Sequence, residues 1–236
     1  AQTTAVGFVP NRGKDTSRGI GLKFGWTGQI TPNLTMGATY QPKTNMSRFD
    51  KYKGLFAQQG QFDIPETFGF GVAFKASDKM TIAADVVQIN YADIKSLANN
   101  GDKFPAFAGT KLGADNGSGF GWTNQTVLKL GMSYQYAPNL LLRAGLNHAK
   151  NPLGSNQTFF NILAPATVEN HLTLGATWTL ANKSELTVSY MHAFENKVTG
   201  VSTGQGAGPA GAGVIGHPVD LKMHQNAIGV AYGWKM

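Results

Sequence analysis

The sequence predicts an all-β chain that folds as an antiparallel, up-and-down transmembrane β-barrel. Stretches of about ten residues alternate apolar and polar side chains, which is the period of a strand with one apolar face. Charged residues form only 14% of the chain, well below the roughly 25% of soluble domains. Short and long connections also alternate between these stretches, as they do in bacterial outer-membrane barrels. We therefore expect about nine strands in one barrel domain over residues 1–236.

Composition excludes several other classes of protein. The mean hydropathy is −0.19, and no run reaches the roughly 18 apolar residues that a membrane-spanning helix needs. Because the chain has no cysteine, it can form neither a disulfide framework nor a thiolate metal site. The net charge is +7, but the basic residues are scattered along the sequence, so we expect no nucleic-acid partner.

The sequence also lacks the signatures of catalytic and metal sites. It contains no nucleophile elbow, phosphate loop or paired-carboxylate motif, and Asp50 and Asp63 are interpreted as loop caps. We expect no enzymatic activity, no cofactor and no metal site. The histidines show no metal-type spacing; they are His148, His171, His192, His217 and His224.

The first predicted hairpin follows residues 1–18, where Pro10 and Gly13 favour a loop. Its arms are Ile20–Thr27 and Leu34–Gln41, joined by a tight turn at Thr31–Asn33. Every second position in both arms is apolar, as a strand hairpin requires. These positions are Ile20, Leu22, Phe24, Trp26, Leu34, Met36, Ala38 and Tyr40.

The second hairpin joins Phe68–Phe74 to Met80–Tyr91 across a turn at Ala76–Asp78. In its second arm the apolar parity changes after Val86, because Val87 is apolar as well. A change of parity within a strand predicts a β-bulge at this point.

Two further hairpins and a final strand repeat the alternation. In the fourth hairpin Leu172, Leu174 and Trp178 share one parity, and Thr173 and Thr177 share the other. Such arms have one apolar and one polar face, so a barrel would turn the apolar face to lipid. The segments are Leu128–Tyr134, Leu140–Leu146, Glu169–Leu180, Glu185–Phe194 and Gln225–Trp234, with turns at Ala137–Asn139 and Ala181–Ser184.

The connections differ in length in a regular way. The turns hold three or four residues, whereas Lys43–Pro65, Asp93–Asn124, Lys150–Thr167 and Glu195–Leu221 are long. Short periplasmic turns and long extracellular loops are the layout of an outer-membrane barrel, whereas a β-sandwich uses Greek-key crossings. Aromatic residues near the strand ends fit interfacial girdles, although a soluble core stays open as an alternative. They are Trp26, Tyr40, Tyr134, Tyr136, Trp178, Tyr190, Tyr232 and Trp234.

The strand count is odd, whereas single-chain bacterial barrels have an even number of strands. The last predicted strand ends on the short-turn side, and the first begins on the long-loop side. We therefore expect the chain to be the C-terminal part of a larger barrel.

Several segments resemble the FadL-type outer-membrane transporters, a family that includes the TodX-like hydrocarbon channels. The segments occur in the family's order over nearly the whole chain from about Gly19. They are MSRFDKYKGLFA at Met46–Ala57, QFDIPE at Gln61–Glu66, DNGSGFGW at Asp115–Trp122, FNILAPATVENHLTLG at Phe160–Gly175 and GVAYGWKM at Gly229–Met236.

This resemblance implies a fourteen-stranded monomeric barrel in the bacterial outer membrane, with an N-terminal segment folded inside as a hatch. These residues would form about the last nine strands, without the hatch, the early strands or the kinked strand implicated in release. The C-terminal Met236 replaces the aromatic residue that usually closes such barrels. The implied partners are hydrophobic molecules, such as fatty acids or hydrocarbons, and the lipid or lipopolysaccharide of the outer membrane.

The long connection 43–65 is the strongest candidate for ligand capture. Its apolar residues include Phe49, Tyr52 and Phe56 at a spacing close to that of a helix. They predict either a hydrophobic groove with basic residues for a carboxylate, or a loop folded on itself as a plug. The candidates are Met46, Phe49, Tyr52, Leu55, Phe56 and Phe62 for the groove, and Arg48 and Lys51 for the carboxylate.

Charged residues of the polar face suggest a second group of candidates. Lys129 and Arg143 would point into the lumen and could bind a carboxylate there. Alternatively, they pair with Asp85, Glu169 or hatch residues, as a polar lumen requires. Lys23 shares this face.

We interpret the chain as part of a passive transporter that captures hydrophobic molecules at its outer loops and passes them through the barrel. The alternatives are a structural or adhesive barrel without transport, an outer-membrane enzyme, for which no catalytic constellation is visible, and a soluble β-sandwich. Gly204–Gly216 is glycine-rich and is interpreted as a mobile extracellular loop.

Overall fold

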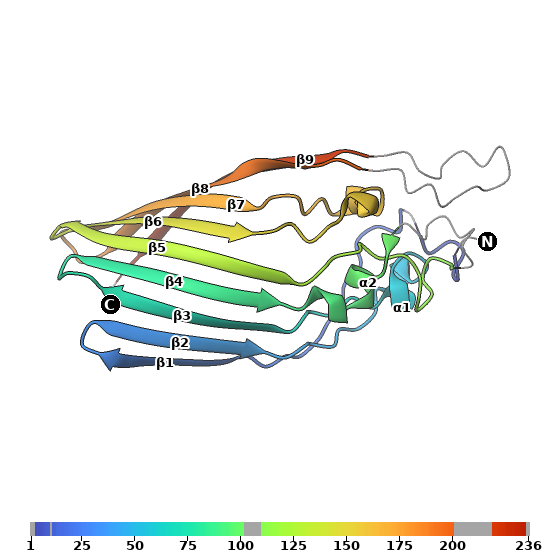
Figure 1. The fold of residues 1–236 in the computed structure, drawn as a ribbon, viewed down its shortest axis with the longest axis horizontal. Helices are drawn as coiled ribbons and strands as arrows, with labels where there is room; N and C mark the ends of the chain where they lie inside the picture. Colours follow the sequence, from blue (N-terminus) through green and yellow to red (C-terminus); the bar gives the residue numbers. More distant parts are fainter. Residues whose placement is uncertain (1–2, 10, 102–109, 201–218, 235–236) are drawn as a thin grey trace.

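A computed structural model describes residues 3–9, 11–101, 110–200 and 219–234 of the chain. The strands of these residues form one antiparallel sheet of nine strands, in which each strand pairs with the next along the chain (Figure 1). The expected up-and-down topology is confirmed. The strands are β1 (Phe24–Thr31), β2 (Leu34–Gln41), β3 (Thr67–Lys75), β4 (Met80–Ile89), β5 (Gln125–Ala137), β6 (Leu140–Ala149), β7 (Asn170–Thr179), β8 (Glu185–Val198) and β9 (Leu221–Gly233).

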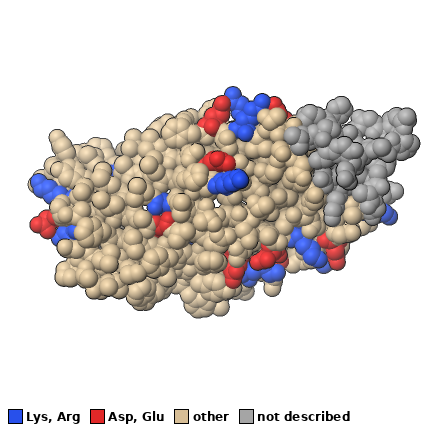
Figure 2. All heavy atoms as spheres, viewed as in Figure 1, with Lys and Arg blue, Asp and Glu red and all other residues tan. Residues whose placement is uncertain are grey.

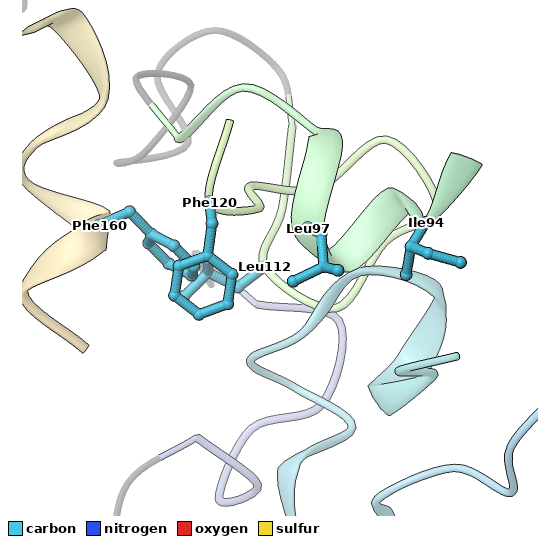
Figure 3. Packing of buried hydrophobic residues seen from close by; sticks show 5 residues of the cluster. All are labelled: Ile94, Leu97, Leu112, Phe120 and Phe160. Carbon is cyan, nitrogen blue, oxygen red and sulfur yellow. The ribbon is translucent and has the colours of Figure 1, made fainter. Parts of the chain in front are cut away.

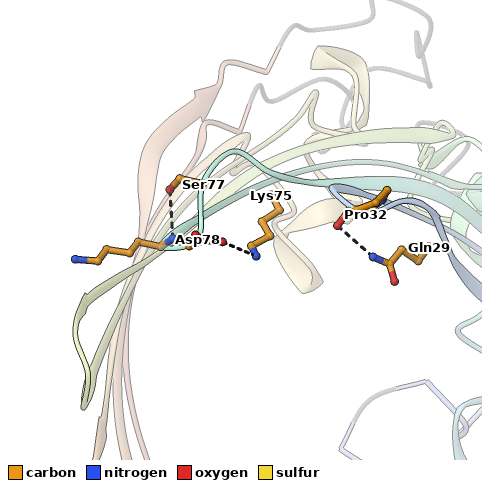
Figure 4. Close-up of polar contacts among 6 residues, drawn as sticks. Gln29, Pro32, Lys75, Ser77 and Asp78 are labelled. Carbon is orange, nitrogen blue, oxygen red and sulfur yellow. Dashed lines mark hydrogen bonds and ion pairs between the residues drawn. The ribbon is translucent and has the colours of Figure 1, made fainter.

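The sheet is curved, and its two faces differ in chemistry. Viewed along the strands it forms an arc, with Gln29 and Lys75 on the inner side (Figure 4). Side chains of the opposite parity, such as Phe70 and Leu130, are large, apolar and exposed on the outer, convex face. In Figure 2 most of the visible face carries neither acidic nor basic side chains. This is the distribution of a barrel wall with lipid outside and a polar lumen inside.

The girdle aromatics lie on the surface. The eight residues predicted from their positions near strand ends are between 36% and 68% exposed. They do not form the core of a soluble domain, and the strands of the described residues all belong to one sheet, without the second layer that a sandwich needs.

Short turns and long connections lie at opposite ends of the sheet, as predicted (Figure 1). Figure 4 shows the contacts that fix two of the turns. Gln29 Nε2 donates to Pro32 O at 3.1 Å, and Lys75 Nζ lies 2.9 Å from Asp78 Oδ1. The backbone N–H of Lys79, the residue after Asp78, donates to Ser77 Oγ in the same turn.

The bulge predicted after Val86 is wrong. β4 keeps a regular register with both neighbours over its whole length. The parity changes because β4 leaves the lipid-facing band here: Gln88 continues the convex face and accepts a hydrogen bond from Thr126 Oγ1. Val87 remains on the inner face. The register shifts occur elsewhere, between Gln29 and Thr31, Gln135 and Ala137, and Ala193 and Asn196.

The largest differences from the predicted strand boundaries are four residues, in β1, β8 and β9, and β5 and β6 extend three residues beyond predicted ends. β1 begins at Phe24 rather than Ile20, and β8 continues past Phe194 to Val198. The extension of β8 pairs with the start of β9, where ion pairs join Lys197 to Asp220 and Lys222 to Glu195. Alternation of apolar residues could not predict it, because charged side chains hold these residues together.

The hydrophobic core lies in the long connections, at one end of the sheet. Its buried side chains are Ile94, Leu97, Leu112, Phe120 and Phe160 (Figure 3). Each is at most 7% exposed. No helix in the described part of the chain is long and apolar enough to cross a membrane. The short helices of the connections are η1 (Asp50–Tyr52), α1 (Ala57–Gly60), η2 (Tyr91–Asp93), α2 (Lys95–Ala98), η5 (Ser155–Gln157) and η6 (Phe160–Leu163).

Candidate functional site

The connection 43–65 closes on itself through backbone hydrogen bonds. Thr44 and Ile64 exchange both N–H···O bonds at 3.0 Å, and Phe49 N donates to Gly60 O at 2.8 Å. The buried carboxylate of Asp63 accepts from Met46 N at 2.8 Å. The loop is therefore a defined structure that can present side chains in fixed positions.

Its aromatic side chains gather around Phe56. The ring centroid of Phe56 lies 6.4 Å from Phe49, 6.5 Å from Tyr52 and 5.4 Å from Phe62. All four side chains are half-buried. They form a partly exposed layer over the core, because Phe56 and Phe62 also contact the Phe120 ring.

Leu55 packs against the same core, but Met46 does not join the group. The Met46 side chain lies beside Gly19, with which its backbone forms a bridge. The residues with helical spacing form only a 3-10 turn, η1. A longer helix does not follow, because Gln58 and Gln59 in α1 both have a non-helical φ of 55°. Sequence spacing thus indicated that the rings would meet, without predicting the backbone that brings them together.

Other connections supply residues that the prediction missed. Phe120 and Trp122 come from the connection before β5, and Phe160 from the one before β7. Their ring centroids lie 5.6 Å apart for Phe120 and Trp122, and 5.2 Å apart for Phe120 and Phe160. The only signal for them was the presence of aromatics in DNGSGFGW and FNIL, since spacing along the chain cannot relate separate loops.

A buried asparagine ties these loops together. Asn161 is fully buried, and its Nδ2 donates to Phe120 O at 2.6 Å and to Gln157 O at 2.8 Å. Its Oδ1 accepts from Trp122 Nε1 at 2.7 Å. Both amide protons and the amide oxygen of Asn161 are therefore used to fix the aromatic core.

The two basic candidates of this loop, Arg48 and Lys51, are exposed. The backbone N–H of Lys51 donates to Asp15 Oδ2 at 2.8 Å, and its Nζ donates to Lys14 O. The ion pairs of the described residues involve neither Arg48 nor Lys51.

Lys129 and Arg143 lie on the inner face and are exposed. Lys129 is directly opposite Asp85 in register, but the Asp85 carboxylate leans over Gly71, where an added Cβ would meet Oδ1 at 2.0 Å. Arg143 Nη1 donates to Thr177 Oγ1 at 2.7 Å. Among the described residues, neither cation is within ion-pair distance of a carboxylate.

The other partner suggested for these cations, Glu169, is engaged elsewhere. Its Oε1 accepts from Asn151 N at 3.0 Å and from Asn151 Nδ2 at 2.6 Å. The inner face near Lys129 instead carries a shallow groove of about 590 Å³, bordered by Lys23, Thr39 and Asp85. In the described residues no group of three or more His, Asp or Glu side chains is arranged for a metal ion.

Outside the strands, Glu66 links two hairpins. Tyr40 Oη donates to its Oε1 at 2.7 Å, and Asn90 Nδ2 donates to its Oε2 at 2.8 Å. These hydrogen bonds lower the pKa of the Glu66 carboxyl, and the bond from Tyr40 has the larger effect.

Residues 11–236 match the sequence model of the family described as "Outer membrane protein transport protein (OMPP1/FadL/TodX)". The chain belongs to this family. Its curved sheet with an apolar outer wall is therefore part of an outer-membrane FadL/TodX-type barrel. A search of curated proteins finds no match.

Solved structures of this family share the fold. The Pseudomonas putida toluene transporter TodX aligns with a TM-score of 0.54 at 17% identity, over 91% of this chain and 48% of TodX. A Pseudomonas aeruginosa FadL homologue aligns with a TM-score of 0.58 at 14% identity, over 90% of this chain and 50% of that protein. A TodX deltaS2S3 mutant, a monoaromatic hydrocarbon channel, aligns with a TM-score of 0.62 at 17% identity, over 97% of this chain and 53% of the mutant. The chain thus spans about half the length of these proteins.

Proposed function

We propose that this chain contributes to the passive transport of hydrophobic molecules across the outer membrane. The observation that supports this function best is the half-buried aromatic surface of Phe49, Tyr52, Phe56 and Phe62 at the loop end of a barrel wall. An apolar ligand would gain by burying surface on these rings. From there it would diffuse along the lumen.

Two pairs of cations would extend the range of ligands to carboxylates such as fatty acids. Arg48 precedes Phe49 and Lys51 precedes Tyr52 in the sequence, and Lys129 and Arg143 lie along the inner wall. Because none of them is within ion-pair distance of a described carboxylate, each can donate charge-assisted hydrogen bonds to a ligand. A neutral hydrocarbon would use the rings alone, as befits a relative of a toluene transporter.

The capture role is tested with the double variant F49S/Y52S. Both side chains are half-buried at the outer layer, so their loss spares the core beneath. The matched control is I64S, which removes an apolar side chain that is 42% exposed in the same connection but outside the ring group. We expect uptake of radiolabelled oleate and toluene by cells expressing the protein to fall about tenfold in F49S/Y52S, the effect of ~1.4 kcal/mol, and to persist in I64S. Unchanged uptake in F49S/Y52S contradicts capture at this surface.

A structural or adhesive barrel is the second candidate, supported by how tightly the loops pack around Asn161. In that case the rings only plug the barrel mouth. Exchange of the connection 43–65 for that of a relative would then alter binding of other molecules to the cell surface. Uptake of oleate and toluene would stay equal to that of cells without the protein, before and after the exchange.

A further inference from the structure

Basic residues that are scattered in the sequence meet in space at one corner of the loop end. Segment 11–18 runs beside segment 43–53, joined by the hydrogen bonds Ser47 N to Arg18 O at 2.8 Å and Tyr52 Oη to Gly13 O at 2.7 Å. The two segments hold seven basic and two acidic residues, an excess of five positive charges in a chain whose net charge is +7. Most of the net charge is thus concentrated here, contrary to the expectation of dispersed charge.

The packing brings basic residues of the two segments together at three places. Arg12 Cζ and Lys53 Nζ lie 4.9 Å and 4.2 Å from the centre of the same Phe8 ring. Lys51 Nζ donates to the carbonyl of Lys14. Arg18 and Arg48 come near each other through the backbone: Arg18 N donates to Ser47 Oγ, Ser47 N donates to Arg18 O, and Arg48 follows Ser47.

The carboxylates nearby do not neutralise these basic residues. Asp15 uses Oδ1 on its neighbour's amide, Thr16 N, and Oδ2 on Lys51 N, both backbone donors. The ion pairs among the described residues involve none of the seven basic side chains. Basic side chains gathered at one corner without carboxylate partners create a positive potential that attracts an anion.

The patch continues directly into the lipid-facing wall. After Arg18, every second residue is a large apolar side chain, with Ile20 96% and Leu22 65% exposed, followed by Phe24 and Trp26. Gly19 and Gly21 occupy the alternate positions, facing Met46 and Thr44. Cations immediately above an apolar band match a lipid that has anionic groups above its acyl chains.

We propose that this basic patch (Arg12, Lys14, Arg18, Arg48, Lys51 and Lys53) binds the phosphorylated glycolipid of the outer leaflet, with its phosphates on the cations and its acyl chains along Ile20–Trp26. The proposal requires the outer-membrane location of the chain and not its transport function. Arg48 and Lys51 are shared with the carboxylate role proposed above, so the test changes only Arg12, Lys14 and Arg18, which that role does not use.

The test measures binding of diphosphoryl lipid A to the detergent-solubilised full-length protein by native mass spectrometry. The variant is R12Q/K14Q/R18Q, which leaves the capture residues intact. The control is K75Q/K79Q/K183Q, which removes the same charge at the short-turn end. A cation near an anionic lipid surface contributes roughly 1 kcal/mol, so we expect affinity to fall about a hundredfold in the first variant and less than threefold in the control.

A second arm uses the unchanged protein with lipid A from which both phosphates have been removed. We expect its affinity to fall to that for phosphatidylcholine, and inorganic phosphate at millimolar concentration to leave lipid binding intact. Equal weakening by both variants, or full affinity for the phosphate-free lipid, overturns the proposal. Displacement by inorganic phosphate would also overturn it, because the site would then bind the free anion. The lipid arm decides the question even if the variant does not fold.

Discussion

At the residue scale, the absence of a side chain at Gly71 leaves room for the Asp85 carboxylate on the inner face. A methyl group at Gly71 would lie 2.0 Å from Asp85 Oδ1 and must displace that carboxylate. Lys129 is the residue directly across from Asp85 in the next strand, so we expect G71A to move Asp85 towards an ion pair with Lys129. The end of a flexible side chain moves at little cost, so the barrel should remain stable.

The measurement is the ratio of oleate to toluene uptake. In G71A this ratio should fall several-fold, because only the carboxylate ligand uses Lys129. G37A is the matched control, since its added methyl meets its nearest atom at 3.4 Å. An unchanged ratio in G71A would mean that Lys129 takes no part in transport.

Glu66 gives the loop end a defined response to acid. Its folded-state pKa is lowered, so its contribution to stability is fully present above the ordinary pKa of 4.5 and is lost as the pH falls through the lower folded value. Asn90 N donates to Glu66 O, and Asn90 Nδ2 donates to Glu66 Oε2. The protection of the Asn90 amide, which is its exchange rate compared with the intrinsic rate at the same pH, should therefore decrease in this acidic range. In E66Q that additional pH dependence should disappear, and its persistence would assign it to another group.

The buried Asn161 side chain is expected to stabilise the loop core through its hydrogen bonds. N161A removes three hydrogen bonds, and with them the Asn161 partner of Trp122 Nε1 and of the Phe120 and Gln157 carbonyls. An unsatisfied buried group costs about 1–3 kcal/mol, enough to loosen the loop core. N156A, an exposed neighbour, is the control.

Limited proteolysis distinguishes the two variants. The connections before β5 and β7 should be cut faster in N161A than in N156A, while the barrel keeps its heat-modifiable migration on gels. Equal cleavage in both would show that the aromatic core does not depend on the asparagine.

At the scale of elements, the strands were predictable because each side chain in a barrel wall faces either lipid or the lumen. That constraint gives β2, β3 and β7 an alternation that reports their boundaries to within about a residue or two. It fails where the environment changes along a strand. Val87 follows Val86 without a bulge because the wall has left the apolar band.

The candidate site was less predictable than the strands. The ring spacing in the connection 43–65 indicated that Phe49, Tyr52 and Phe56 meet, but Phe120 and Phe160 come from separate connections. Their contact depends on how the sheet positions the ends of its strands. The basic patch could not be predicted from the sequence either, because segments 11–18 and 43–53 are adjacent only in space.

At the scale of the whole molecule, strand direction determines how the sheet can close. Eight consecutive antiparallel pairings give β1 and β9 the same direction. They cannot pair with each other antiparallel, so within the described residues each keeps one edge without a partner strand. An open edge is a template for pairing with another chain.

We therefore expect the 236-residue chain, refolded alone in detergent, to self-associate through these edges rather than form a closed monomer. Light scattering coupled to gel filtration should give a mass of at least twice 25.1 kDa of protein. Because the chain lacks cysteine, single-cysteine variants identify the contact: T27C on β1 should cross-link between copies, whereas T173C on β7, which has a partner strand on both sides, should not. A monodisperse, heat-modifiable monomer would contradict this expectation, because it would require the nine strands to close without an antiparallel partner for either edge.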